Sequence, residues 1–165
     1  MPGQVDIAVL ALPLQITPTY PVEIGAANLY VSQDVYFLGF PFGLSTDAGD
    51  LNRGFPVPFV KKGVCSAFNL KPEFMVIFID GHNNPGFSGG PIVSVDPGSQ
   101  TLRIVGVVSG YRFQEDRVIM QGAKTDLIVQ SNTGILIGYG IKNALGAIEK
   151  NQIGPVVPTG AGAPR

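Results

Sequence analysis

The chain has few of the residues that build most metal and redox sites. Its 165 residues include no tryptophan, one cysteine and one histidine. The single cysteine, Cys65, excludes an internal disulfide. Because no histidine lies near it in the sequence, we expect Cys65 to be a small buried apolar side chain and not a nucleophile or ligand. The sequence therefore implies no metal and no organic cofactor.

Charged residues and long apolar runs are also scarce. Charged residues make up 14% of the chain and the formal net charge is −1, so we expect binding neither to nucleic acid nor to an anionic membrane. The longest apolar runs, such as Ile7–Leu14 and Val105–Val108, are far shorter than a bilayer requires. No leader pattern follows Met1, so an export signal would have to lie upstream. Apolar residues make up 45%, which predicts a globular domain with a substantial core.

Short β-strand patterns separated by turns rich in glycine and proline dominate the chain. Many short strands at this spacing predict an all-β barrel or sandwich. One helical pattern covers Asn143–Asn151, with Asn143 as its cap. The predicted strands are Val5–Leu12, Asn28–Val31, Val35–Phe40, Phe59–Asn69, Phe74–Ile79, Pro91–Val95, Leu102–Ser109, Val118–Ala123 and Ile135–Ile141.

A serine set among glycines is the most informative pattern. It lies in the run Asn84-Pro85-Gly86-Phe87-Ser88-Gly89-Gly90-Pro91. Glycines allow a tight turn in which the amides of Gly86 and Ser88 both point at one spot beside the serine hydroxyl. Such a spot binds an oxyanion, so the pattern predicts acyl-transfer chemistry with Ser88 as the nucleophile.

This chemistry needs a base, which takes the proton of the attacking hydroxyl while a buried carboxylate orients it. The single histidine, His82, lies six residues before Ser88 on the same predicted loop. We expect its ring to be too constrained there to act as that base. The usual base is therefore expected to be absent from the chain.

Several stretches together resemble the trypsin-like serine proteases, in particular those of the Deg/HtrA type. The resemblance runs in the right order over residues 5 to 150. Gly140 and Lys142 replace the alanine and proline of the motif at its end. The matching stretches are Val5–Leu12 with its D-I-A-V-L start, Gly39–Leu44 as a G-x-P-x-G turn, Asp80–Pro91 around the serine, Ile104–Ser109 and Gly138–Ile141.

The resemblance implies a fold of two antiparallel six-stranded barrels with the active site between them. Residues 1–12 would be the last strand of the first barrel, 13–34 the connection, 35–151 the second barrel with a C-terminal helix, and 152–165 a flexible tail. In this family the histidine lies a few dozen residues before the aspartate, whereas five residues precede Asp6. Most of the first barrel, and the catalytic histidine with it, is therefore expected to be missing.

Residue roles follow from the same resemblance. Ser88 would be the nucleophile, the amides of Gly86 and Ser88 would form the oxyanion hole, and Asp6 would orient the histidine, although a solvated aspartate also fits that position. His82 would form the floor of the primary specificity pocket, where it could favour an acidic or amide side chain. A solvated turn histidine fits equally well.

The wall of that pocket would be Ser109, Gly110 and Tyr111, which pair with the backbone of a polypeptide substrate as an added strand. The family often has a small residue at the position of Tyr111, so the tyrosine would narrow the cleft.

Two classes of function remain open. The chain would be the C-terminal portion of a serine endopeptidase, nearly inactive as given because it lacks the histidine. Alternatively, it would be a pseudoprotease or binding module, or a half-protease completed by a partner chain or by self-association. Its docking surface would then include the edge of Val5–Leu12. A processing protease whose N-terminal half is a separate product would look the same in sequence.

Overall fold

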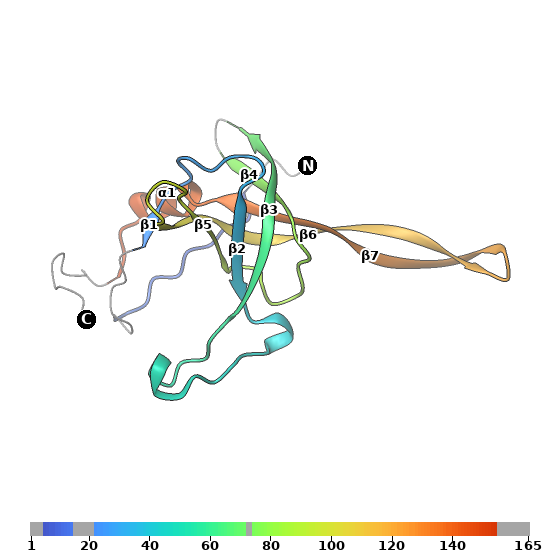
Figure 1. The fold of residues 1–165 in the computed structure, drawn as a ribbon, viewed down its shortest axis with the longest axis horizontal. Coiled ribbons are helices and arrows are strands. Elements are labelled where there is room, and N and C mark those ends of the chain that lie inside the picture. The colour runs from blue at the N-terminus through green and yellow to red at the C-terminus, as the bar shows by residue number, and fades with distance from the viewer. Residues whose placement is uncertain (1–4, 15–21, 72–73, 155–165) are drawn as a thin grey trace.

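The computed structural model describes residues 5–14, 22–71 and 74–154. β-Strands dominate these residues, with two short 3₁₀ turns and one C-terminal helix (Figure 1). This confirms the all-β class with a C-terminal helix. The elements are β1 (Glu23–Ile24), β2 (Asp34–Gly39), η1 (Pro41–Gly43), η2 (Gly49–Asn52), β3 (Phe59–Leu70), β4 (Met75–Asp80), β5 (Pro91–Val95), β6 (Leu102–Met120), β7 (Ala123–Gly140) and α1 (Lys142–Lys150).

The strands form one sheet in the order β1-β6-β5-β2-β3-β4-β7. The short β1 pairs in parallel with β6, and all other pairs are antiparallel. Because β6 also pairs with β7, the pairing of β2 to β7 forms a continuous ring. Each of these six strands has two neighbours within the ring, and β6 also pairs with β1. The pairing thus surrounds a single core.

That core follows from alternation along the strands. In β2, for example, Val35 and Phe37 are fully buried, whereas their neighbours are partly exposed, because successive side chains point to opposite faces of a strand. The buried cluster comprises Val35, Phe37, Cys65, Ile77, Ile79, Phe87, Ile92, Val105, Val108 and Leu136.

Several predicted boundaries are wrong. Residues 5–12 form no strand, because a strand needs hydrogen-bonding partners and no described residue supplies them. Residues 28–31 contain turns, with Asn28 in a left-handed conformation (φ 67°). The helix begins at Lys142 without a side-chain cap, so Asn143 is not the cap. Residues 15–21 of the predicted connection and residues 155–165 of the predicted tail lie outside the described residues.

The last strands differ most from expectation. The three separate predicted strands at 102–109, 118–123 and 135–141 are parts of one hairpin of 19- and 18-residue strands. Gln121 and Gly122 turn it, both with positive φ (50° and 80°), as a tight hairpin turn requires. We call residues 112–133 the arm, since there β6 and β7 pair only with each other. The arm projects far from the rest of the molecule (Figure 1).

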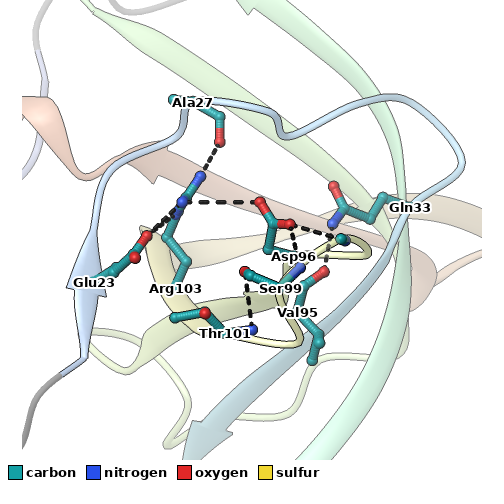
Figure 2. A network of polar contacts seen from close by, with 9 residues as sticks. Glu23, Ala27, Gln33, Val95, Asp96, Ser99, Thr101 and Arg103 are labelled. Carbon is teal, nitrogen blue, oxygen red and sulfur yellow. Dashed lines mark hydrogen bonds and ion pairs between the residues drawn. The ribbon is translucent and has the colours of Figure 1, made fainter.

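A polar network holds the connection before β2 against the sheet (Figure 2). The Arg103 side chain, 16% exposed, forms an ion pair with Glu23, donates to the carbonyl of Ala27 at 2.7 Å, and lies 3.8 Å from Asp96. The amides of Ser99 and Gly98 bond to the Asp96 carboxylate and hold its pKa below the usual value, with a smaller contribution from Arg103. Arg103 therefore links residues 23–27 to the hairpin of β5 and β6, which is distant from them in sequence.

Cys65 is fully buried in the core, as predicted. Burial raises the pKa of its thiol from 9.0 to about 11, because the thiolate would lose its hydration. The native state thus holds this proton more tightly than the unfolded state. The stabilisation is complete below pH 9 and is lost as the pH rises from about 9 through about 11.

We expect urea unfolding at pH 8 to 11 to show this loss as an extra decrease of roughly 2 kcal/mol in the free energy of unfolding. The control is Cys65→Val, which keeps an apolar side chain of similar size. The decrease should be smaller by that amount in the variant. Equal pH dependence in both proteins would contradict the assignment to Cys65.

Of the helices in the described part of the chain, none is long and apolar enough to cross a membrane.

Candidate active site

The loop between β4 and β5 carries Ser88 and is anchored through its neighbour, Phe87. The Phe87 ring is fully buried and meets Phe37 edge-to-face, with ring centroids 5.2 Å apart. After the serine, the Gly89 amide donates to the carbonyl of Val108 at 2.8 Å, and the Val108 amide donates to Gly90 at 2.9 Å. These contacts fix both sides of Ser88, and its side chain stays exposed.

A second turn, at residues 39–43, is hydrogen-bonded to the loop that carries Ser88. The predicted G-x-P-x-G turn at 39–43 forms η1, and its Phe40 amide donates to the carbonyl of Gly86 at 2.9 Å. The Phe42 amide donates to the carbonyl of Pro85 at the same distance. In the sequence this motif was recognised only by its resemblance to the family, and its structural role was not predicted. Its physical role here is to hold the serine loop by backbone hydrogen bonds.

The lack of side chains at Gly86 and Gly90 lets the serine loop lie close to the backbone of residues 38–40. A Cβ atom on Gly86 would lie 2.1 Å from the carbonyl oxygen of Phe40, and one on Gly90 would lie 1.9 Å from that of Leu38. Gly86 also has a φ of 102°, a conformation that L side chains rarely adopt. The backbone of β2 and η1 therefore occupies the space that side chains would need at these two positions.

The amides of Gly86 and Ser88 flank Phe87. Among the described residues, neither amide donates a hydrogen bond to a protein acceptor. Gly86 and Ser88 are exposed residues. Two backbone amides without an acceptor, separated by one residue in a tight turn, are the kind of donors that an anion site uses.

Asp6 and Ser88 line the same pocket. The pocket has a volume of about 380 Å³, and Ser109 and the segment 6–10 also line it. The Ser88 hydroxyl donates to the carbonyl oxygen of Ser109, with an Oγ–O distance of 3.0 Å. Asp6 is exposed. The structure thus brings together three of the predicted residues.

His82 does not join them. It is exposed and does not line the described pocket that contains Ser88 and Asp6. Its carbonyl oxygen accepts a hydrogen bond from Lys61 Nζ at 2.8 Å. The same ammonium group bonds to Asn84 Oδ1 and lies 5.4 Å from the centroid of the Phe87 ring. Lys61 is a support of the loop that sequence reasoning missed, because a lysine in a strand carries no signal of its distant contacts.

The remaining predicted residues, Gly110 and Tyr111, lie on β6 directly before the arm. Gly110 and Tyr111 pair with Ile137 and Leu136 of β7, and Tyr111 is half-buried. With Ser109, whose carbonyl accepts the Ser88 hydrogen bond, they place the strand β6 directly beside the serine.

A buried asparagine next to His82 connects the loop to the base of the arm. Asn83 is 1% exposed, and its carbonyl accepts a 2.6 Å hydrogen bond from the Asn132 side chain. The other end of the Asn132 amide accepts from the Gly134 amide at 2.9 Å. Sequence reasoning missed this pair as well, since the two asparagines are distant in sequence.

An all-β fold with a serine in a glycine-rich loop and a carboxylate at the same pocket is an arrangement that serine peptidases use. Comparison with known families agrees. The family model of the trypsin-like peptidase domain matches residues 2–107, more than half of the chain. The chain belongs to this family.

A curated relative gives a narrower similarity. The chain is 35% identical over 89 residues to Protease Do-like 1, chloroplastic, of Arabidopsis thaliana. The match covers 53% of this chain and 19% of the relative, so it spans about a fifth of that protein's length. Together with the family match, this confirms the resemblance to trypsin-fold proteases of the Deg/HtrA-like type.

Proposed function

We propose that this chain is the C-terminal portion of a serine endopeptidase, with Ser88 as its nucleophile. The observation that supports the proposal is that Ser88 and Asp6 line the same pocket, and that neither the Gly86 amide nor the Ser88 amide donates to an acceptor among the described residues. The family membership supports peptide-bond hydrolysis as the reaction.

In the proposed reaction the Ser88 oxygen attacks the peptide carbonyl carbon, and the developing oxyanion is held by the amides of Gly86 and Ser88. The proton of the hydroxyl must pass to a base. In the structure that hydroxyl donates to the Ser109 carbonyl, and His82 is not at the pocket. The base is therefore a histidine outside residues 1–165, and Asp6 orients it.

The domain assignment belongs to this proposal. Residues 1–12 are the end of a first barrel whose other strands come from elsewhere, and residues 35–151 are the second barrel with its C-terminal helix. The absence of strand pairing at residues 5–12 fits a segment that lacks its neighbours. The substrate is a polypeptide whose backbone pairs with β6 at Ser109–Tyr111.

Exogenous imidazole tests the proposal, because it can take the place of the missing base. A fluorophosphonate probe reacts with an activated serine: the serine oxygen bonds to phosphorus, fluoride leaves, and the base takes the proton. We expect labelling of this chain at Ser88, mapped by mass spectrometry, at a rate that increases with imidazole concentration.

Ser88→Ala should abolish the labelling. Ser45→Ala, which changes an exposed loop serine, is the matched control and should leave the rate unchanged. Labelling of other serines, or a rate at Ser88 that is independent of imidazole, would contradict the proposed mechanism. A folded protein that stays unlabelled at high imidazole would favour the alternative, a binding module.

A further inference from the structure

One edge of β6 leads from the serine site out along the arm. β5 lies along this edge as far as Val107. Next to it, the serine loop exchanges backbone hydrogen bonds with Val108, and the Ser88 hydroxyl donates to the Ser109 carbonyl. From Gly110 to Met120, β6 pairs only with β7 among the described residues, and β7 lies on its opposite edge. We call the edge of residues 110–120 that β7 leaves uncovered the free edge.

The irregularities of the arm lie on β7 and not on β6. Residues 133–135 of β7 lie opposite Arg112 alone, and residues 125–127 lie opposite Val118 alone. Extra residues of this kind bend a strand and protect its outer edge from further pairing. β6 has no extra residue in the arm. Its free edge is therefore the regular template for an added strand.

The two bulges also show which way the backbone groups of β6 point. Thr133 Oγ1 donates to the Arg112 carbonyl at 2.8 Å. Thr125 Oγ1 donates to the Val118 carbonyl at 2.9 Å. Both carbonyls therefore point towards β7. Because successive residues of a strand direct their N–H and C=O groups to alternate edges, the groups of the odd-numbered residues from Phe113 to Arg117 point to the free edge.

The arm exposes apolar side chains that a third strand would cover. An isolated two-stranded ribbon is at best marginally stable in water, whereas three strands with an apolar face form a stable sheet. Phe113, Ile119 and Ile128 are 53%, 64% and 58% exposed. They share one face, because Phe113 and Ile119 are an even number of residues from Arg117, which pairs with Ile128. The two basic and two acidic side chains of β6 in the arm balance, so the arm selects no charge.

We propose that the free edge binds the segment of a substrate polypeptide that precedes the bond to be cleaved. This inference rests on the proposed catalytic function of Ser88. Antiparallel pairing is the more stable arrangement, and with the reacting bond beside Ser109 it directs the preceding residues towards Ile119. The substrate class is an extended polypeptide that is added to the sheet as a strand. Its alternate apolar side chains pack on Phe113 and Ile119.

Diphenyl phosphonate probes of two lengths test the proposal on the intact chain, with imidazole supplied as the base. The serine oxygen bonds to phosphorus, a phenolate leaves, and imidazole takes the serine proton. The short probe carries a single residue before the phosphorus. The long probe carries valine alternating with glutamine and reaches from Ser109 to Ile119. We expect the long probe to label Ser88 roughly tenfold faster, which corresponds to about 1.4 kcal/mol.

Variants of the arm show whether the free edge causes this difference. Arg117→Pro removes an N–H group from the free edge and leaves the pairing with β7 in place, so the ratio of the two rates should fall towards one. Arg117→Ala keeps that N–H group and should give a larger ratio than the proline variant. Phe113→Ser with Ile119→Ser removes the apolar contacts and should also lower the ratio. Leu127→Ser with Val129→Ser, at β7 positions that are 60% and 54% exposed, should not.

Failure of the arm and failure of catalysis give different results. Equal rates for the two probes would overturn the role of the arm, whereas no labelling by either probe would count against catalysis. Hydrogen exchange of Ser88→Ala with the long peptide, ending in an amide in place of the phosphonate, measures binding without catalysis. We expect slower exchange in residues 110–120. Unchanged exchange there at saturating peptide would overturn the proposal even if Ser88 proved unreactive.

Discussion

Gly86→Ala is expected to destabilise the protein by about 2–6 kcal/mol and to slow labelling of Ser88 about 10²–10³-fold. A left-handed conformation costs a non-glycine residue about 1–3 kcal/mol, and forcing a methyl group into occupied space costs a similar amount. The occupied space is real, because the new Cβ would lie 2.1 Å from the Phe40 carbonyl oxygen. The displaced loop would also lose an oxyanion donor, which accounts for the slower labelling.

Gly89→Ala is the matched control. Gly89 has a similar positive φ (85°), but a Cβ there meets nothing within 4 Å. Its cost should be limited to backbone strain, about 1–3 kcal/mol. Urea unfolding of both variants separates strain from collision, and equal losses would contradict the collision. The contact with the Phe40 carbonyl thus adds a folding penalty to the loss of the oxyanion donor.

Phe87→Ala is expected to lower the free energy of unfolding by about 3–5 kcal/mol, the usual cost of removing a buried aromatic ring. Phe87 is fully buried, packs edge-to-face on Phe37 and lies beneath the Lys61 ammonium. Because the ring anchors the loop between Gly86 and Ser88, loss of packing should also abolish imidazole-dependent labelling. Thermal or urea unfolding and the probe assay measure the two effects.

Two further variants define that effect. Phe87→Leu keeps an apolar side chain in the cavity and should cost less than the alanine variant and retain part of the labelling. Phe113→Ala removes a ring that is 53% exposed on the arm and should change stability by no more than about 0.5 kcal/mol. If Phe87→Ala proved as mild as Phe113→Ala, the loop would not depend on its packing.

Much of the fold was predictable because its signals are local. The strand pattern at Pro91–Val95 matches β5 at both ends, and that at Phe59–Asn69 matches β3 to within one residue. The helix begins one residue before its predicted start. Alternating apolar side chains and turn residues determine these elements over a few positions, so no distant contact is needed to recognise them.

The predictions failed where pairing between distant segments determines whether residues form a strand. The apolar pattern of residues 5–12 favours a strand, but a strand forms only beside a partner. The polar residues of the arm carry weak strand signals, yet cross-strand contacts such as that between Ser131 and Asp116 extend β6 and β7 through them. In both regions the presence or absence of a paired strand has more influence on the secondary structure than the local sequence pattern has.

For the site, the sequence by itself determined the chemical groups: a serine between glycines, an aspartate at the start of a strand-like run, and no second histidine. The tertiary structure decided how they meet. It placed Asp6 at the pocket of Ser88, kept His82 away from it, and set the backbone of Phe40 against Gly86. The sequence gives the residue types directly. The distances between segments depend on burial and strand pairing, and these involve the whole molecule.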